Sequence, residues 1–142
     1  MKNIESKTLT ELENNDWGET DSDSYIEQAC FRLRKKKIGE LDIEDLRILI
    51  GQGVGVPFLL PIALTILESN PLAEGRHYKG DLLCSVLQLG PEFHSKNKKI
   101  KPMLLNIISR AKREAEQLED YEAEITMEAL TEAVNYFETP LN

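Results

Sequence analysis

The side chains best suited to catalysis or metal binding are few in this 142-residue chain: two histidines, His77 and His94, and two cysteines, Cys30 and Cys84. Neither histidine has a second ligand at helical spacing, and His77 with Cys84 does not make a zinc pattern. A nucleophile beside a histidine would have to be assembled in space, because nothing in the local sequence supports one. An acid/base pair needs two carboxyl groups in different environments, so that their pKa values differ. The carboxylates of this chain lie in polar stretches, which do not provide such a difference. We therefore predict no enzyme, no metal site and no cofactor.

Carboxylates are far more numerous, and they are concentrated in two segments. Seven acidic residues and no basic residue lie between Glu11 and Glu27, and nine more lie between Glu114 and the C-terminus without a Lys or Arg. The net charge of −8 argues against direct binding to nucleic acid and against an anionic membrane surface. An acidic protein without a catalytic set usually acts by binding, and its favoured partner is a basic surface. The alternative is that the charge only keeps the protein soluble.

Length and composition predict a single domain over residues 1–142, with 1–7 as a loosely ordered tail. The 41% hydrophobic and 30% charged content is ordinary for a soluble globular protein. The N-terminus has no apolar run of the secretory kind, so we expect a cytoplasmic location and reduced, buried cysteines, with one disulfide as the alternative. The apolar run 46–67 has the length of a membrane span, but its glycines and prolines favour two short buried helices joined by a turn.

Helix start signals precede several apolar stripes, at Thr8, Ser24, Asp42 and Asp81. No segment alternates with period two for long enough to predict a strand. We therefore predict an all-α fold, a single compact bundle of six or seven helices. The basic run 32–37 suits the C-terminal end of a helix, with a nucleic-acid or nuclear-localisation patch as the alternative.

Three stretches are harder to assign. Residues 58–67 are apolar on nearly every face, which predicts a central buried helix with Pro61 in its first turn. Residues 91–99 are expected to form a loop or a single turn. The apolar stripe over 103–137 predicts a long, acidic C-terminal helix or a helix pair with a break near Thr126.

Several short segments occur together in a fixed order: 9–13, 16–19, 23–25, 32–35, 43–52, 71–75, Tyr78 and 80–83. With them, the chain resembles the immunity proteins of bacterial contact-dependent growth inhibition (CDI) systems over about residues 8–90. It departs from that pattern at Lys37, where the family has Pro, and nothing is recognised from Pro91 onward. The Pro71–Leu83 motif has the character of a turn, a cap and core residues.

The resemblance implies a protein that waits in the cytoplasm, binds the toxin domain delivered by a neighbouring cell and neutralises it. Such toxins are the C-terminal domains of large surface proteins, and many are nucleases, often acting on tRNA. A nuclease attracts phosphates, so its groove is basic and an acidic protein complements it. Two other interpretations stay open: an acidic helical adaptor for another basic protein, and a small hydrolase assembled around His77 or His94.

The acidic segments would then contact the toxin in a stoichiometric complex without turnover, their carboxylates taking the place of phosphates. Trp17 is either an interface anchor or a residue that closes the core. The predicted toxin-binding residues are Asp16, Trp17, Glu19, Asp21 and Asp23 in the first segment, with Glu119, Asp120, Glu122 and Glu124 in the second.

Overall fold

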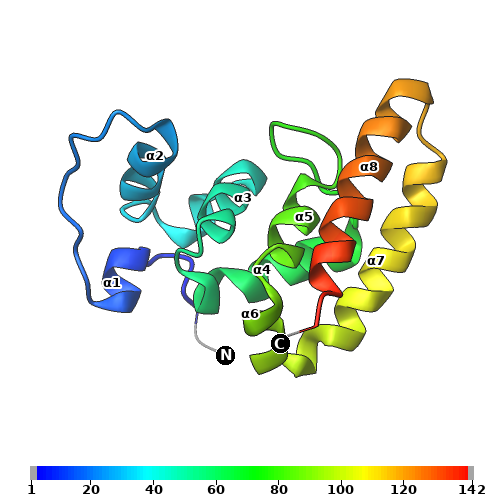
Figure 1. Cartoon of the computed structure of the whole chain (residues 1–142). Helices are drawn as coiled ribbons and strands as arrows, with labels where there is room; N and C mark the ends of the chain where they lie inside the picture. The colour runs from blue at the N-terminus through cyan, green and yellow to red at the C-terminus, as the bar shows by residue number, and fades with distance from the viewer. Residues whose placement is uncertain (1–2, 141–142) are drawn as a thin grey trace.

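The computed structural model describes residues 3–140, which form eight α-helices and two single-turn 3₁₀ helices and contain no strand. Figure 1 shows α1–α3 at one end of the molecule and the α7–α8 pair at the other, with α4–α6 between them. The α-helices are α1 Leu9–Glu13, α2 Tyr25–Leu33, α3 Ile43–Gly51, α4 Val56–Ser69, α5 Asp81–Leu87, α6 Pro91–Lys96, α7 Lys101–Glu116 and α8 Asp120–Phe137; the 3₁₀ helices are η1 Ile38–Glu40 and η2 Lys98–Ile100.

The prediction of an all-α fold is confirmed, but six or seven helices is too few. The additional helix is α6, in the stretch expected to be a loop or single turn. It begins at Pro91, where the fixed φ of proline suits the first helical position. Its six residues are too short to give an apolar stripe, which is why periodicity does not reveal it.

The capping signals act as expected at three of four positions. Thr8 and Asp42 each form a complete capping box, and the Ser24 hydroxyl accepts a hydrogen bond from the Glu27 N–H. The prediction for Asp81 is wrong: Gly80 is the N-cap of α5, with φ of 93°, and Asp81 is the first helical residue. Its carboxylate points back to the preceding loop and accepts hydrogen bonds from there.

The expectation for Pro61 is also wrong, because α4 starts at Val56 and Pro61 lies inside it, beyond the first turn. Pro57 and Pro61 are both exposed, on the side of α4 away from the core. A proline costs a helix one backbone hydrogen bond, and that loss is smaller where water reaches the backbone.

The C-terminal stripe folds into two antiparallel helices, α7 and α8, whose break comes at 117–119 and not near Thr126 (Figure 1). Glu119 is extended and Asp120 has a positive φ of 28°, which turns the chain. Thr126 is buried inside α8. Both helices bury the same kind of face, so the apolar pattern continues through the turn.

The core joins the two ends of the molecule through α3, α5 and α8: α3 packs on α5, α5 packs on α8, and α8 packs on α7. Cys30 and Cys84 are buried free thiols, as predicted. At the N-terminal end, the carbonyls of Glu5 and Lys7 accept hydrogen bonds from the N–H groups of two η1 residues, Gly39 and Ile38. No helix among residues 3–140 is long and apolar enough to cross a membrane.

Candidate functional site

The first acidic segment forms an extended connection between α1 and α2, on the outside of the molecule (Figure 1). It is held by Arg34, whose side chain is only 1% exposed, pairs with Glu13 and donates to the Asn15 carbonyl. The Arg34 guanidinium also lies 4.2 Å from the ring centroid of Trp17, and Phe31 meets that ring edge-on at 5.2 Å. Trp17 nevertheless remains 39% exposed. It therefore fastens the segment to α2 and still presents part of its ring to solvent.

Two of the four predicted acids in this segment are already engaged by neighbours. Glu19 forms an ion pair of 2.8 Å with Lys35, and Asp16 accepts a hydrogen bond from the Gly18 N–H at 2.8 Å. Asp21 and Asp23 are exposed and have no side-chain partner among the described residues. Of these two contacts, the Lys35 ion pair offsets part of the local negative charge, whereas the Gly18 N–H only orients Asp16.

The second acidic segment lies at the start of α8, where Glu119, Asp120, Glu122 and Glu124 are all exposed. We call these four residues and Tyr121 the α8 acidic surface. Of the four carboxylates, only Glu122 has an ion-pair partner among residues 3–140, Lys79 at 4.0 Å. Tyr121 is 75% exposed in the middle of them. Acids in the first turn of a helix also interact favourably with its macrodipole, so the surface is compatible with a stable helix.

The structure does not bring the two acidic segments together. In Figure 1 the α1–α2 connection lies at one edge of the molecule and the α7–α8 turn at the opposite side. Sequence reasoning missed the exposed tyrosines, Tyr25 (57% exposed) within the first segment and Tyr121 within the second. An aromatic residue inside an acidic stretch is a signal that could have indicated both tyrosines as binding residues, but the prediction applied it only to Trp17.

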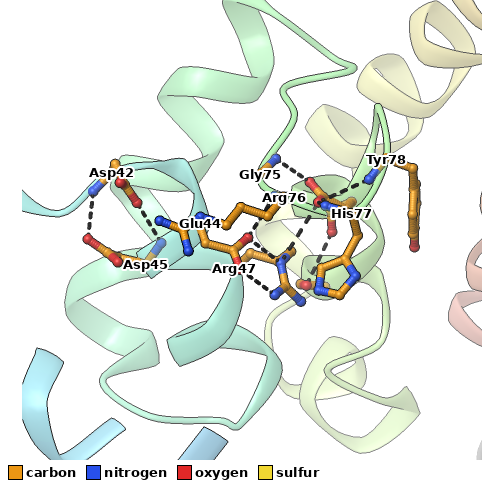
Figure 2. A network of polar contacts seen from close by, with 10 residues as sticks. Asp42, Glu44, Asp45, Arg47, Gly75, Arg76, His77 and Tyr78 are labelled. Atoms are coloured by element: carbon orange, nitrogen blue, oxygen red, sulfur yellow. Dashed lines mark hydrogen bonds and ion pairs between the residues drawn. The ribbon is translucent and has the colours of Figure 1, made fainter. Parts of the chain in front are cut away.

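A buried polar network lies between α3 and the loop that precedes α5 (Figure 2). The Glu44 carboxylate accepts two hydrogen bonds from Arg47, at 2.8 and 2.7 Å, and a third from the Arg76 N–H at 2.9 Å. Asp81, which is 3% exposed, accepts from the N–H groups of Gly75 at 2.7 Å and His77 at 3.0 Å. Two buried carboxylates therefore hold the backbone of this loop.

The network explains several of the motif residues. A Cβ on Gly75 would lie 2.5 Å from Glu44 Oε1, so only glycine leaves room for the carboxylate. The bonds go to the backbone, and the side chains of Arg76 and His77 stay exposed. The loop that the network holds is linked to α8 by the Lys79–Glu122 ion pair. The Pro71–Leu83 motif thus has a structural part, and it places this loop beside the α8 acidic surface.

The hydrogen bonds from Arg47 and from the Arg76 N–H lower the pKa of Glu44 from 4.5 to about 2. A carboxyl group whose pKa is depressed by folding stabilises the protein above its unfolded pKa, and this contribution is lost as the pH falls from about 4.5 toward 2. We expect Glu44→Gln to lower the free energy of unfolding at pH 7. Between pH 4.5 and 2, the free energy of unfolding of the variant should fall by about 3 kcal/mol less than that of the unmodified protein. Urea unfolding at a series of pH values measures this. The control is Glu40→Gln, an exposed carboxylate nearby; equal pH profiles for both variants would contradict the assignment.

Two of the candidate residues, Cys84 and His94, contact backbone carbonyls through their side chains. The Cys84 thiol lies 3.7 Å from the Ala129 carbonyl, and burial raises its pKa to about 11, so it stays protonated at neutral pH. His94 bonds the Val86 carbonyl at 3.1 Å. The side chain of His77 is exposed, and its backbone N–H donates to the Asp81 carboxylate. No group of three metal-ligating side chains occurs in the part of the chain that the structure describes.

Comparison with known proteins places these features in a family. A family model described as CDI immunity proteins matches residues 11–104, which is more than half of the chain. Searches of curated proteins and of solved structures give no significant match. The matched region includes the first acidic segment and the Glu44–Asp81 network, and it ends in the first turn of α7, so the α8 acidic surface lies outside it. The chain belongs to the family of CDI immunity proteins.

Proposed function

We propose that this protein neutralises its cognate CDI toxin, a nuclease with a basic groove, by binding it one to one through the α8 acidic surface. The observation that carries the proposal is the cluster of four exposed carboxylates around an exposed tyrosine, at the start of a well-formed helix. Three of these carboxylates have no ion-pair partner among residues 3–140. They are therefore available to a partner.

Two arguments favour this surface over the first acidic segment. Glu19 and Asp16 in the first segment are already engaged by Lys35 and by the Gly18 N–H. An immunity protein must also distinguish one toxin from related ones, and discrimination resides in the parts that family members do not share. The α8 acidic surface lies outside the matched region, whereas the first segment lies inside it.

The mechanism is occupation of the groove that would otherwise hold nucleic acid. Carboxylates on α8 take positions that phosphates would take on the toxin, and Tyr121 fills a pocket between them. The opposite charges speed the encounter, and the buried contact excludes the substrate. Neutralisation of this kind takes place in the cytoplasm, has no turnover and needs one immunity protein for each toxin.

The first test is co-purification and calorimetry with the toxin domain encoded beside this protein. We expect a one-to-one complex whose affinity falls as salt is raised, together with loss of RNA cleavage, with tRNA as the first substrate to assay. Tight binding without salt dependence would contradict the charge mechanism and keep the immunity role. Recovery of a basic partner other than a toxin would support the adaptor function instead.

Tyr121→Ala is expected to lower the affinity for the toxin about 10- to 100-fold, because exposed aromatic residues that become buried dominate interfaces. The side chain is 75% exposed in the free protein, so the melting temperature should stay unchanged. Calorimetry with the purified toxin domain measures the affinity. Tyr25→Ala is the matched control, since Tyr25 is 57% exposed within the other acidic segment. A larger loss for Tyr25→Ala would move the interface to that segment.

A further inference from the structure

A cavity of about 770 Å³ opens at the opposite end of α8 from the acidic surface. It lies between α6, the start of α7 and the residues that follow α8. Phe137 lies 13 residues after Glu124, the last residue of the α8 acidic surface, so the helix separates the two sites by about 20 Å. A ligand in this cavity would therefore leave the proposed toxin contact free.

The walls of the cavity are partly apolar. Phe137 is buried, and Leu105 stays 43% exposed where it faces the opening. The His94 ring lies edge-on to Phe137, with centroids 4.7 Å apart. Burial lowers the pKa of His94, so this ring is neutral at pH 7 and adds no charge to the cavity. An apolar group could cover these side chains and remove Leu105 from water.

The polar side chains of the wall already donate to nearby carbonyls. Ser95 donates to Glu92 at 2.9 Å, Asn97 to Phe93 at 2.7 Å, and Thr139 to Asn135 at 2.9 Å. These donors hold α6 and the end of α8 in shape. Any charged group that enters the cavity must therefore be recognised mainly by the lysines.

Lys98 and Lys101 lie at the rim, and neither forms an ion pair within residues 3–140. Lys96, by contrast, is paired with Glu92 at 3.0 Å. Glu138 is the one carboxylate among the described residues that line the cavity, so Lys98 and Lys101 leave a positive balance among those residues. In a chain of net charge −8, a local positive rim beside an apolar wall favours a ligand of opposite charge.

We propose that this cavity binds a small organic anion with an apolar body, such as an aromatic carboxylate or sulfonate. Its charged group lies between Lys98 and Lys101, and its body packs on Leu105 and Phe137. The cavity volume is within the range of sites that enclose small molecules, which combine an apolar wall with a few placed polar groups. The site is independent of the proposed toxin contact.

The probe for the test is 8-anilinonaphthalene-1-sulfonate, an aromatic monoanion whose fluorescence rises in apolar surroundings. We expect saturable binding of one equivalent to the folded full-length protein at pH 7.5. Lys98→Glu/Lys101→Glu should weaken binding at least tenfold, and so should Leu105→Asp. The charge-matched control is Lys37→Glu/Lys112→Glu, which changes the net charge equally at residues that do not line the cavity.

A second readout locates the probe and keeps the proposal falsifiable if one variant fails to fold. The ring resonances of His94 should shift on titration with the probe, whereas those of the exposed His77 should not. Melting curves identify any variant that has lost its fold. Binding of several equivalents, or one-site binding that survives both cavity variants, would overturn the proposal, as would equal weakening by the control pair. Absence of binding by the unmodified protein would overturn it directly.

Discussion

Reversal of the α8 acidic surface, as Glu119→Lys/Asp120→Lys/Glu122→Lys/Glu124→Lys, is expected to lower the affinity for the cognate toxin by about a thousandfold or more, roughly 4 kcal/mol. Each lysine would face the basic groove with a like charge, so attraction becomes repulsion at the centre of the proposed contact. Calorimetry and inhibition of RNA cleavage measure the loss, and a growth assay against toxin-delivering cells measures the loss of protection.

The matched control is Asp16→Lys/Glu19→Lys/Asp21→Lys/Asp23→Lys, which changes the net charge by the same amount at the other end of the molecule. If long-range attraction by net charge were the whole effect, the two variants would lose equal affinity. We expect the control to lose less than about tenfold, mostly in the association rate. The reverse order would assign the interface to the first segment, and no loss in either variant would refute phosphate mimicry even if immunity remained.

Folding must be separated from binding in this comparison. Lysines in the first turn of α8 oppose the helix macrodipole and cost about 0.3–1 kcal/mol each at an exposed position. The uncharged version, with Gln and Asn at the same four positions, avoids most of that cost. It should still lose affinity, though less than the lysine version, because attraction is removed without repulsion. A melting temperature near that of the unmodified protein shows that the loss is a contact effect.

The parts of the fold that could be predicted from sequence are those set by local signals. Caps at Thr8, Ser24 and Asp42 depend on bonds to residues three positions away, so spacing reveals them. The role of Asp81 could not be predicted in this way. The N–H groups that donate to its carboxylate lie in the loop that precedes α5. Arg47 of α3 lies 3.8 Å from the same carboxylate, and only the tertiary fold brings α3 near it.

The candidate site was predicted in its composition but not in its arrangement. Exposure of the acids follows from the polar character of their segments. The distance between the two sets, and the capture of Glu19 by Lys35, depend on how the helices pack. One wall of the cavity at the end of α8 is formed by α6, in the stretch expected to be a loop or a single turn. Sequence periodicity reports which face of a helix is buried, whereas it does not report which surfaces lie next to each other.

Gly75→Ala is expected to lower the free energy of unfolding by about 3 kcal/mol, because the new methyl group would overlap a buried carboxylate and separate a buried charge network. Its Cβ would lie 2.5 Å from Glu44 Oε1 and 3.2 Å from Asp81 Oδ2. Glu44 cannot move away without losing its bonds to Arg47 and the Arg76 N–H. For a chain of this size we expect a decrease in melting temperature of about 10 °C, measured by circular dichroism together with urea unfolding.

Gly51→Ala is the matched control, since a Cβ there meets only Ser85 Oγ at 3.7 Å, an ordinary contact. Gly51 ends α3, where alanine favours the helix, so this variant should be neutral or slightly more stable. The network bonds the loop backbone and none of its side chains belongs to the α8 acidic surface, so Gly75→Ala should weaken protection only in step with the fraction unfolded. A Gly75→Ala protein as stable as the unmodified one would show that the loop relaxes freely and that the two carboxylates do not hold it. Unchanged stability combined with lost toxin binding would instead make the loop beside α8 part of the contact itself.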